Sequence, residues 1–306
     1  MDTPSVLGDF LRSRRARLQP EDVGLQAYGA RRRVPGLRRE ELAQLAGVSV
    51  THYTRLEQGQ STNASDAVLD AIARALRLNA DETAHLRDLA RPAVPTRQAP
   101  LRPDHARPAV TQLIAAMTDV PAVILDRRND VLAWNPLGHA LLAWHIDFSS
   151  PRSPSERPNL TRMLFLDEHT RELHTAWEEE AKTSVAALRL IAGRHPDDRR
   201  LAELIGRLAM KSDEFAAMWS RHPVRSCTSG TKVLHHPFVG ALELSFESMQ
   251  LADGSGQRML AYSAPAGSAS EAGLQLLAGA VLNHPSYDGR PTGVRGRLAG
   301  EKPSEK

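Results

Sequence analysis

A proline-dense segment interrupts the 306-residue chain in its first half, with prolines at positions 92, 95, 100, 103 and 108. A helix is excluded there, because proline has no backbone N–H and its ring clashes with the preceding turn. The composition instead favours a semi-rigid, extended linker over residues 91–106. Since the chain is long enough for two domains, we predict one over residues 1–90 and another over residues 107–282. The tail, residues 283–306, is rich in glycine, proline and charge and is expected to be disordered.

Positive charge is concentrated in the first of these domains. The whole chain carries a formal net charge of +3, and its charged fraction of 25% is ordinary for a globular protein. Residues 10–39, however, hold nine arginines against two acidic residues, a local net charge of +7. Such a field suits a polyanion. A solvated arginine-rich surface explains the charge, taken alone, equally well.

Residues 38–59, RREELAQLAGVSVTHYTRLEQG, have the pattern of a helix-turn-helix. The first helix is expected to bury Leu42 and Leu45, with a small residue, Ala43, where the second helix crosses it. Gly47 takes the turn, because a left-handed backbone costs glycine least.

The second helix of this motif has a cap, an inner face and an end. Ser49 is a typical N-cap, Val48 fills the angle between the helices, and Tyr53 and Leu56, three residues apart, form the inner face. Gly59 is expected to end the helix. Further amphipathic helices flank the motif, so we predict an N-terminal five-helix bundle.

The outward side of the second helix carries small and polar side chains. Small residues in a first turn suit insertion into a major groove, which is about 12 Å wide. Base contacts are predicted for Val50, Thr51, Thr54 and Arg55, with Arg55 reaching a guanine. Phosphate contacts are predicted for Arg38, Arg39, Ser49, His52 and Gln58. A helix-turn-helix that binds a protein instead of DNA is the alternative.

The second domain mixes strand and helix patterns. PAVILDRRNDVLAWN predicts two short strands joined by a turn at residues 127–130, and ALELSFE alternates as a half-buried strand does. Residues 160–222 predict a block of helices, and SEAGLQLLAGAVL predicts a closing helix. We therefore expect a mainly α chain whose second domain is α+β, with helices inserted between strands at its two ends.

Aromatic side chains cluster in this second domain, and we predict that they line an apolar pocket between the sheet and the inserted helices. They are Trp134, Trp144, Phe165, Trp177, Phe215, Trp219 and Phe238. The polar anchors expected in the pocket are Asn135, Arg189, His222 and Arg225. Core packing explains each aromatic residue as simply, and salt bridges or helix caps explain each polar one.

Enzymatic and metal chemistry are not expected. The sequence has no GxSxG elbow, no glycine-rich phosphate loop and no HExxH motif. His222, Cys227, His235 and His236 are close in sequence, but the adjacent histidines on a strand point to opposite faces and cannot easily share an ion. Nothing selects His139 or His145 as a haem ligand, so we expect no cofactor and no metal.

A single cysteine, Cys227, excludes an internal disulfide and leaves a cytoplasmic location as the default expectation. No run approaches the ~20 apolar residues that a membrane span requires. The first residues lack the apolar segment of a signal peptide. We therefore expect no membrane partner.

Residues 5–90 resemble the Cro/C1-type (XRE) helix-turn-helix family, and VPGLRREELAQLAGVSVTHYTRLEQG is close to its MmyB-like subgroup. The segments VLAWNP, LFLD, LRLIAGRHP, SDEFAAMWSRHPVR, HHPFVGALELSFE and LAYSAPAGSAS resemble the ligand-binding domain of that subgroup. The resemblance implies a PAS-like sensor fold for residues 107–282 and a role as a bacterial transcription regulator. It also implies a small apolar ligand, fatty-acid-like or of another kind.

Together these observations predict a sequence-specific regulator of double-stranded DNA, acting as a homodimer on two half-sites about 34–36 Å apart. Two alternatives stay open. One is a protein-interaction module, and the other is a ligand-free regulator whose α+β domain only dimerises.

Overall fold

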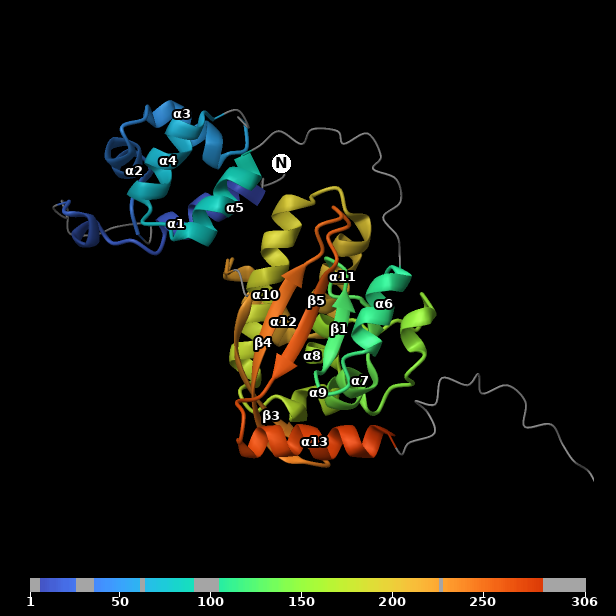
Figure 1. Cartoon of the computed structure of the whole chain (residues 1–306). Coiled ribbons are helices and arrows are strands. Elements are labelled where there is room, and N and C mark those ends of the chain that lie inside the picture. The colour runs from blue at the N-terminus through green and yellow to red at the C-terminus, as the bar shows by residue number, and fades with distance from the viewer. Residues whose placement is uncertain (1–5, 26–35, 61–63, 91–104, 226–227, 283–306) are drawn as a thin grey trace, which may run out of the picture.

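The computed structural model describes residues 6–25, 36–60, 64–90, 105–225 and 228–282. It shows a helical N-terminal domain and an α+β C-terminal domain (Figure 1). The predicted linker, apart from residues 105 and 106, lies outside the described residues, as do the predicted tail, Cys227 and the arginines at 31–33.

Five α-helices form the described part of the N-terminal domain, as the sequence predicts. They are α1 (Val6–Arg15), α2 (Arg39–Ala46), α3 (Val50–Glu57), α4 (Asp66–Ala75) and α5 (Ala80–Ala90), with a short 3-10 helix, η1 (Pro20–Val23), after α1. Their apolar stripes meet in one core, in which Phe10, Leu42, Tyr53, Ile72 and Leu86 are all buried.

The turn between α2 and α3 forms as its residues dictate. Gly47 has a φ of 65°, and the Ser49 hydroxyl accepts a hydrogen bond from the N–H of His52 at 3.1 Å. The prediction that Leu45 is buried is wrong, because 37% of it is exposed. The buried residues of α2 are Leu42, Ala43 and Ala46, a stripe with Ala46 at its middle, and at 3.6 residues per turn Leu45 lies about 100° from Ala46.

A five-stranded antiparallel sheet, in the order β2-β1-β5-β4-β3, forms the centre of the C-terminal domain. Its strands are β1 (Ala122–Leu125), β2 (Val131–Trp134), β3 (Ser229–His236), β4 (Gly240–Gln250) and β5 (Arg258–Ser263). The chain leaves the sheet after β2, forms the predicted helical block, and returns to place β5 beside β1. This is the predicted arrangement of helices inserted between terminal strands.

Alternate side chains of the sheet face two different layers of helices. On one face α6 (Pro108–Ala115) covers Ile124, and on the other face Leu125, Leu244 and Leu260 pack in the main core. Helices of that main core include α7 (Pro136–Ala143), α8 (Leu160–Leu166), α9 (Glu168–Leu173) and α13 (Ala269–Leu282). Beside them lie α10 (Trp177–Arg194), α11 (Arg199–Lys211) and α12 (Asp213–Ser220), and a short 3-10 helix, η2 (Ser150–Arg152), follows α7.

The strand patterns are confirmed at the level of single residues. Along β4, Leu242, Leu244 and Phe246 are buried, whereas the residues between them are exposed. His235 is exposed and His236 is buried, so the two adjacent histidines do point to opposite faces. Among the described residues, no helix combines the length and the apolarity needed to cross a bilayer.

Candidate nucleic-acid interface and ligand cavity

Helix α3 presents the predicted residues on its outer side. Thr51, Arg55 and Gln58 are exposed, Val50 is 42% exposed, and Thr54 is half-buried. On the opposite side of the same helix Tyr53 and Leu56 are fully buried, as predicted. The helix therefore offers a face of small and polar side chains that no other described element covers.

A buried carboxylate fixes α3 from beneath. Glu57 is 1% exposed, and its two oxygens accept hydrogen bonds from Nε and Nη2 of Arg15, both at 2.9 Å. Arg39 adds a third bond at 3.0 Å, and Arg15 also donates to the carbonyl of Leu37 at 2.5 Å. Burial alone would raise the pKa of the Glu57 carboxyl, but the bonds and charge of Arg15, with Arg39, hold it below its usual value. The ion pair joins α3 to α1 and α2.

The predicted phosphate contacts have different local roles. Arg38 and Gln58 are exposed. The Ser49 hydroxyl caps α3, because it accepts a hydrogen bond from the N–H of His52. The guanidinium of Arg39 contacts Glu57 with 38% of its side chain still exposed. Nε2 of His52 is buried and has no hydrogen-bond partner among the described residues, so its ring turns toward the protein. Glu57 is not among the residues predicted from the sequence, although its place four residues after Tyr53 puts both on the inner face.

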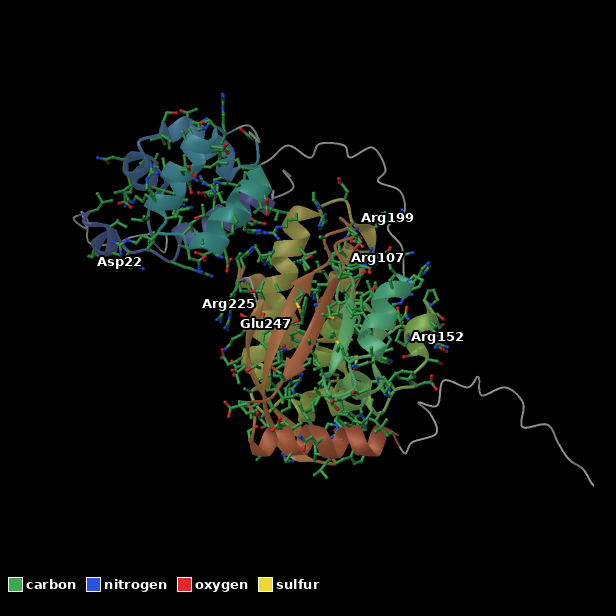
Figure 2. All side chains as sticks on the ribbon, in the orientation of Figure 1. Asp22, Arg107, Arg152, Arg199, Arg225 and Glu247 are labelled. Atoms are coloured by element: carbon green, nitrogen blue, oxygen red, sulfur yellow. The ribbon has the colours of Figure 1, made fainter. Side chains whose placement is uncertain are left out.

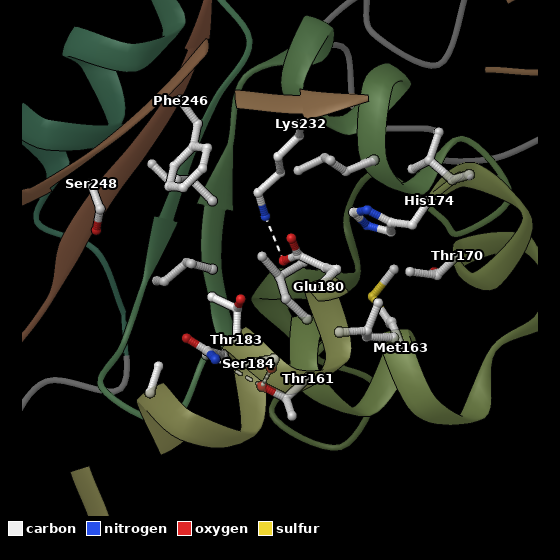
Figure 3. Close-up of a pocket in the computed structure, with 18 of the residues that line it drawn as sticks. Thr161, Met163, Thr170, His174, Glu180, Thr183, Ser184, Lys232, Phe246 and Ser248 are labelled. Atoms are coloured by element: carbon white, nitrogen blue, oxygen red, sulfur yellow. Dashed lines mark hydrogen bonds and ion pairs between the residues drawn. The ribbon is translucent and has the colours of Figure 1, made fainter. Parts of the chain in front are cut away.

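A cavity of about 120 Å³ lies in the C-terminal domain between the sheet and helices α8, α9 and α10 (Figure 3). Its apolar lining includes Leu142, Met163, Leu173, Phe246 and Leu260. Its polar lining includes Thr161, Thr170, His174, Glu180, Thr183, Ser184, Lys232, Ser248, Arg258 and Tyr262. The cavity is thus mixed in character.

Charged groups of both signs face this cavity. The ammonium of Lys232 on β3 lies 2.5 Å from the carboxylate of Glu180 on α10, a pair drawn in Figure 3. Arg258 on β5 donates to the side-chain oxygen of Asn129 and, at 3.0 Å, to the carbonyl of Asp126. Burial lowers the pKa of His174 to about 4, so its imidazole is neutral at pH 7.

The alternation of inward and outward side chains along a strand is the sequence signal that could have identified Lys232 and Arg258. In β3, β4 and β5 the positions that face the helices hold Leu234, Phe246 and Leu260, and every second residue shares that face. Lys232 lies two residues before Leu234, and Arg258 lies two residues before Leu260, so both are at inward positions where an apolar residue is expected. Polar residues at inward positions are uncommon and mark a cavity or a buried ion pair.

None of the eleven residues predicted to line or anchor a pocket lines this cavity, although all eleven are described. Phe165, Trp177, Phe215 and Trp219 pack against one another between helices, with the rings of Phe215 and Trp219 stacked at 5.7 Å. Phe238 is 71% exposed. Phe165, Trp177, Phe215 and Trp219 therefore join the inserted helices to one another.

The other predicted residues lie near the ends of α7 or between the domains. Trp134 donates its indole N–H to the carbonyl of Phe148 at 2.9 Å, and Trp144 packs against His236. Asn135 is a buried cap of α7. Arg189 and His222 hydrogen-bond to each other beside α1 of the N-terminal domain. Arg225, also suggested as an anchor, is exposed (Figure 2).

The two domains share a packed contact at the C-terminal part of α10. Leu190 and Val224, both from the C-terminal domain, are buried in the core of the N-terminal helices. Arg14 of α1 donates to the carbonyl of His222 at 2.7 Å, and Nη1 of Arg189 lies 3.1 Å from Nδ1 of His222. The contact is therefore partly apolar and partly a network of arginine hydrogen bonds.

Helix α5 rests directly on α10 at this contact. His85 of α5 is 1% exposed, and burial together with the charge of Arg189 lowers its pKa to about 4. A Cβ atom at Gly193 of α10 would lie 2.5 Å from Cε1 of His85, so only glycine fits there. Arg194 closes the edge with an ion pair to Asp88 at 2.9 Å.

Both domains of the chain match known protein families. A helix-turn-helix domain family matches residues 6–86, and the ligand-binding domain of MmyB-like transcription regulators matches residues 106–277. No curated protein matches the chain. Both matches are to regulatory modules and not to enzymes, and the second spans more than half of the chain. The chain therefore belongs to the MmyB-like transcription regulators, with a helix-turn-helix DNA-binding domain followed by a ligand-binding domain.

Proposed function

We propose that this regulator recognises a specific DNA sequence through α3 and that a small molecule in the α8–α10 cavity controls its binding. The observation that carries the proposal is the outer face of α3, exposed while its inner face is fixed by Tyr53, Leu56 and the Glu57 ion pair. A recognition helix needs this combination of free side chains and a rigid base.

The base contact proposed for each outer side chain follows from its chemistry. Val50 and Thr51 offer methyl groups to thymine, Thr54 offers a hydroxyl, and Arg55 offers two donors to guanine O6 and N7. Arg38, Arg39, Ser49 and Gln58 are proposed to contact phosphates and to set the register of the helix. His52, whose Nε2 is buried, is withdrawn from that set.

Replacing Arg55 with alanine is expected to weaken binding to the best operator by about 1–3 kcal/mol and to relax the preference at one base pair. The operator would first be selected from random duplexes, and fluorescence anisotropy would then compare affinities on single-base variants. Arg74→Ala is the matched control, since Arg74 is an exposed arginine on α4. An Arg55 variant that kept the parental preference at every position would remove Arg55 from base recognition.

The protein-interaction alternative differs from this proposal in its response to salt. Binding that neutralises several phosphates loses about 10³–10⁵ in affinity between 50 and 200 mM salt. The same anisotropy titration, repeated over that range, tests this. Binding that hardly changed with salt would favour a protein partner.

The size of the cavity limits the ligand in the conformation seen. A volume of about 120 Å³ is close to the roughly 150 Å³ of a cavity that holds benzene. A compact ligand with at least one polar group fits this space and its mixed lining, whereas a fatty-acid-like chain requires the helices to separate. Native mass spectrometry of the full-length protein tests both the ligand and the proposed homodimer. A dimer with a discrete added mass supports the proposal, and a clean monomer contradicts it.

Helix α10 provides a route from the cavity to the DNA-binding domain. Its N-terminal half carries Glu180 and Ser184 to the cavity, and its C-terminal half carries Leu190 and Gly193 to α5. We propose that a ligand which shifts α10 also shifts the N-terminal domain, provided that it binds the two arrangements with different affinities.

Replacing Gly193 with alanine should loosen the contact between the domains by about 1–3 kcal/mol, because the new methyl group overlaps the ring of His85. Hydrogen exchange of α5 amides should then accelerate by about 5–150-fold. Gly206→Ala on α11 is the control, since a Cβ there meets nothing within 4 Å. Equal exchange in both variants would argue against a tight contact between α5 and α10.

A further inference from the structure

Two histidines and an aspartate meet at the outer side of the junction between α7 and α9. His145 follows α7, whereas Asp167 and His169 begin α9. Nε2 of His145 lies 2.5 Å from Oδ2 of Asp167, and Nδ1 of His169 lies 3.4 Å from Oδ1 of the same carboxylate. One ligand atom from each residue lies within 4.8 Å of the other two.

These separations are close to those of a metal site. At bond lengths of about 2.0–2.1 Å, the ligand atoms around a tetrahedral Zn²⁺ lie roughly 3.4 Å apart. The two histidines contact different oxygens of Asp167, so the carboxylate would offer both oxygens to the ion. The separation of His145 Nε2 from Oδ2 would open by less than 1 Å, and that of His169 Nδ1 from Oδ1 already fits. Two imidazoles and one carboxylate are a donor set that suits Zn²⁺ and Co²⁺ and that leaves a coordination position open.

The surroundings fix the carboxylate of Asp167 between the two imidazoles. The Thr170 hydroxyl donates to Oδ2 of Asp167 at 2.9 Å, and the backbone N–H of His169 donates to Oδ1 at 3.1 Å. The imidazoles of His145 and His169 stack at 4.4 Å with an interplanar angle of 12°, so the exposed His169 ring would turn out of the stack to bring both ring nitrogens toward one ion. Trp144 packs edge-on against His145. The side chain of His169 is 55% exposed, which gives an ion access from solvent.

We propose that His145, Asp167 and His169 form a binding site for a divalent transition metal ion of the zinc type. Nδ1 of His145 is buried and has no hydrogen-bond partner among the described residues. His145 therefore lacks the hydrogen bond that the second ring nitrogen of a metal-bound histidine usually makes. The expected dissociation constant is therefore modest, on the order of 1–10 µM. The ion would join the end of α7 to α9, whose Thr170 and Leu173 line the cavity.

Chelator-treated full-length protein, titrated with Zn²⁺ in a calorimeter, is expected to bind one equivalent per chain. His169→Ala should weaken that binding by at least about 100-fold, because losing even a hydrogen-bond partner of a ligand costs about 10–100-fold. His169 is the residue to change, since its exposed side chain contributes little to folding. His235→Ala, which removes another exposed histidine, should leave the affinity unchanged.

Trp144 supplies a second, local readout. Co²⁺ bound at the site should quench the fluorescence of Trp144, whose ring lies 5.3 Å from that of His145 and 6.2 Å from that of His169. Trp144→Phe should abolish this quenching while Zn²⁺ still binds. Zn²⁺ binding that His169→Ala leaves intact, or that His235→Ala weakens equally, would overturn the proposal. So would the absence of saturable binding below about 1 mM.

Discussion

Glu57→Ala is expected to lower the free energy of unfolding of the N-terminal domain by about 3–5 kcal/mol, which is the usual cost of removing one partner of a buried ion pair. The variant leaves Arg15, only 8% exposed, without its carboxylate. It also releases Arg39 from α3. Urea unfolding followed by circular dichroism measures the loss, and operator binding should fall with it because α3 loses its support.

Two controls separate the ion pair from general sensitivity of the domain. Glu40→Ala removes an exposed acid of α2 and should change stability by less than about 0.5 kcal/mol. Replacing the pair together, as Arg15→Met with Glu57→Leu, should restore much of the loss, since apolar residues of similar volume often replace buried ion pairs at little cost. A Glu57→Ala variant as stable as the parent would show that the pair does not hold α3.

The same pair gives the domain a predictable response to acid. The folded-state pKa of Glu57 is lowered, so its stabilisation is fully present above the ordinary pKa of a glutamate. That stabilisation is lost as the pH falls through the lower, folded-state value.

Asn135→Ala is expected to destabilise the C-terminal domain by about 3–5 kcal/mol, because four backbone groups, two of them fully buried, lose their partner at roughly 1 kcal/mol or more each. The side-chain oxygen accepts from the N–H groups of Gly138, at 2.7 Å, and Ala122, at 3.0 Å. The side-chain nitrogen donates to the carbonyls of Met117 and Val120, both at 2.7 Å.

Thermal unfolding of Asn135→Ala beside Gln112→Ala, an exposed amide on α6, checks this expectation. Ligand binding provides a further distinction, since Asn135 was predicted as a pocket anchor. If Asn135 only anchors a ligand, the variant keeps its melting temperature and loses only the mass of the bound ligand in native mass spectrometry. A large shift in melting temperature supports the role in folding.

The local structure of the chain could be predicted from its sequence because it depends on neighbouring residues. Gly47 and Ser49 set the turn before α3, and the alternation of Leu242, Leu244 and Phe246 set the faces of β4. Both are short-range rules of backbone conformation and burial. The family itself was recognised from segments of this kind and is confirmed by the matches over residues 6–86 and 106–277.

The candidate sites were harder to predict, because they depend on partners far apart in the sequence. Arg15 and Glu57 are 42 residues apart, and Lys232 and Glu180 are 52 apart. Aromatic residues were favoured as pocket walls, yet large flat side chains serve equally to join helices, as Phe215 and Trp219 do. The long-range pairing of polar groups, and not the apolar content, marks the cavity.

Helix α10 also has a consequence for how the molecule unfolds. Leu190, together with Val224, belongs to the core of the N-terminal helices, whereas Val185 and Leu188 of the same helix belong to the core of the inserted helices. Neither core can lose its order without exposing apolar surface of the other. The proline-rich segment therefore marks a boundary in the sequence but not a complete energetic one, because unfolding of either domain also destabilises the other.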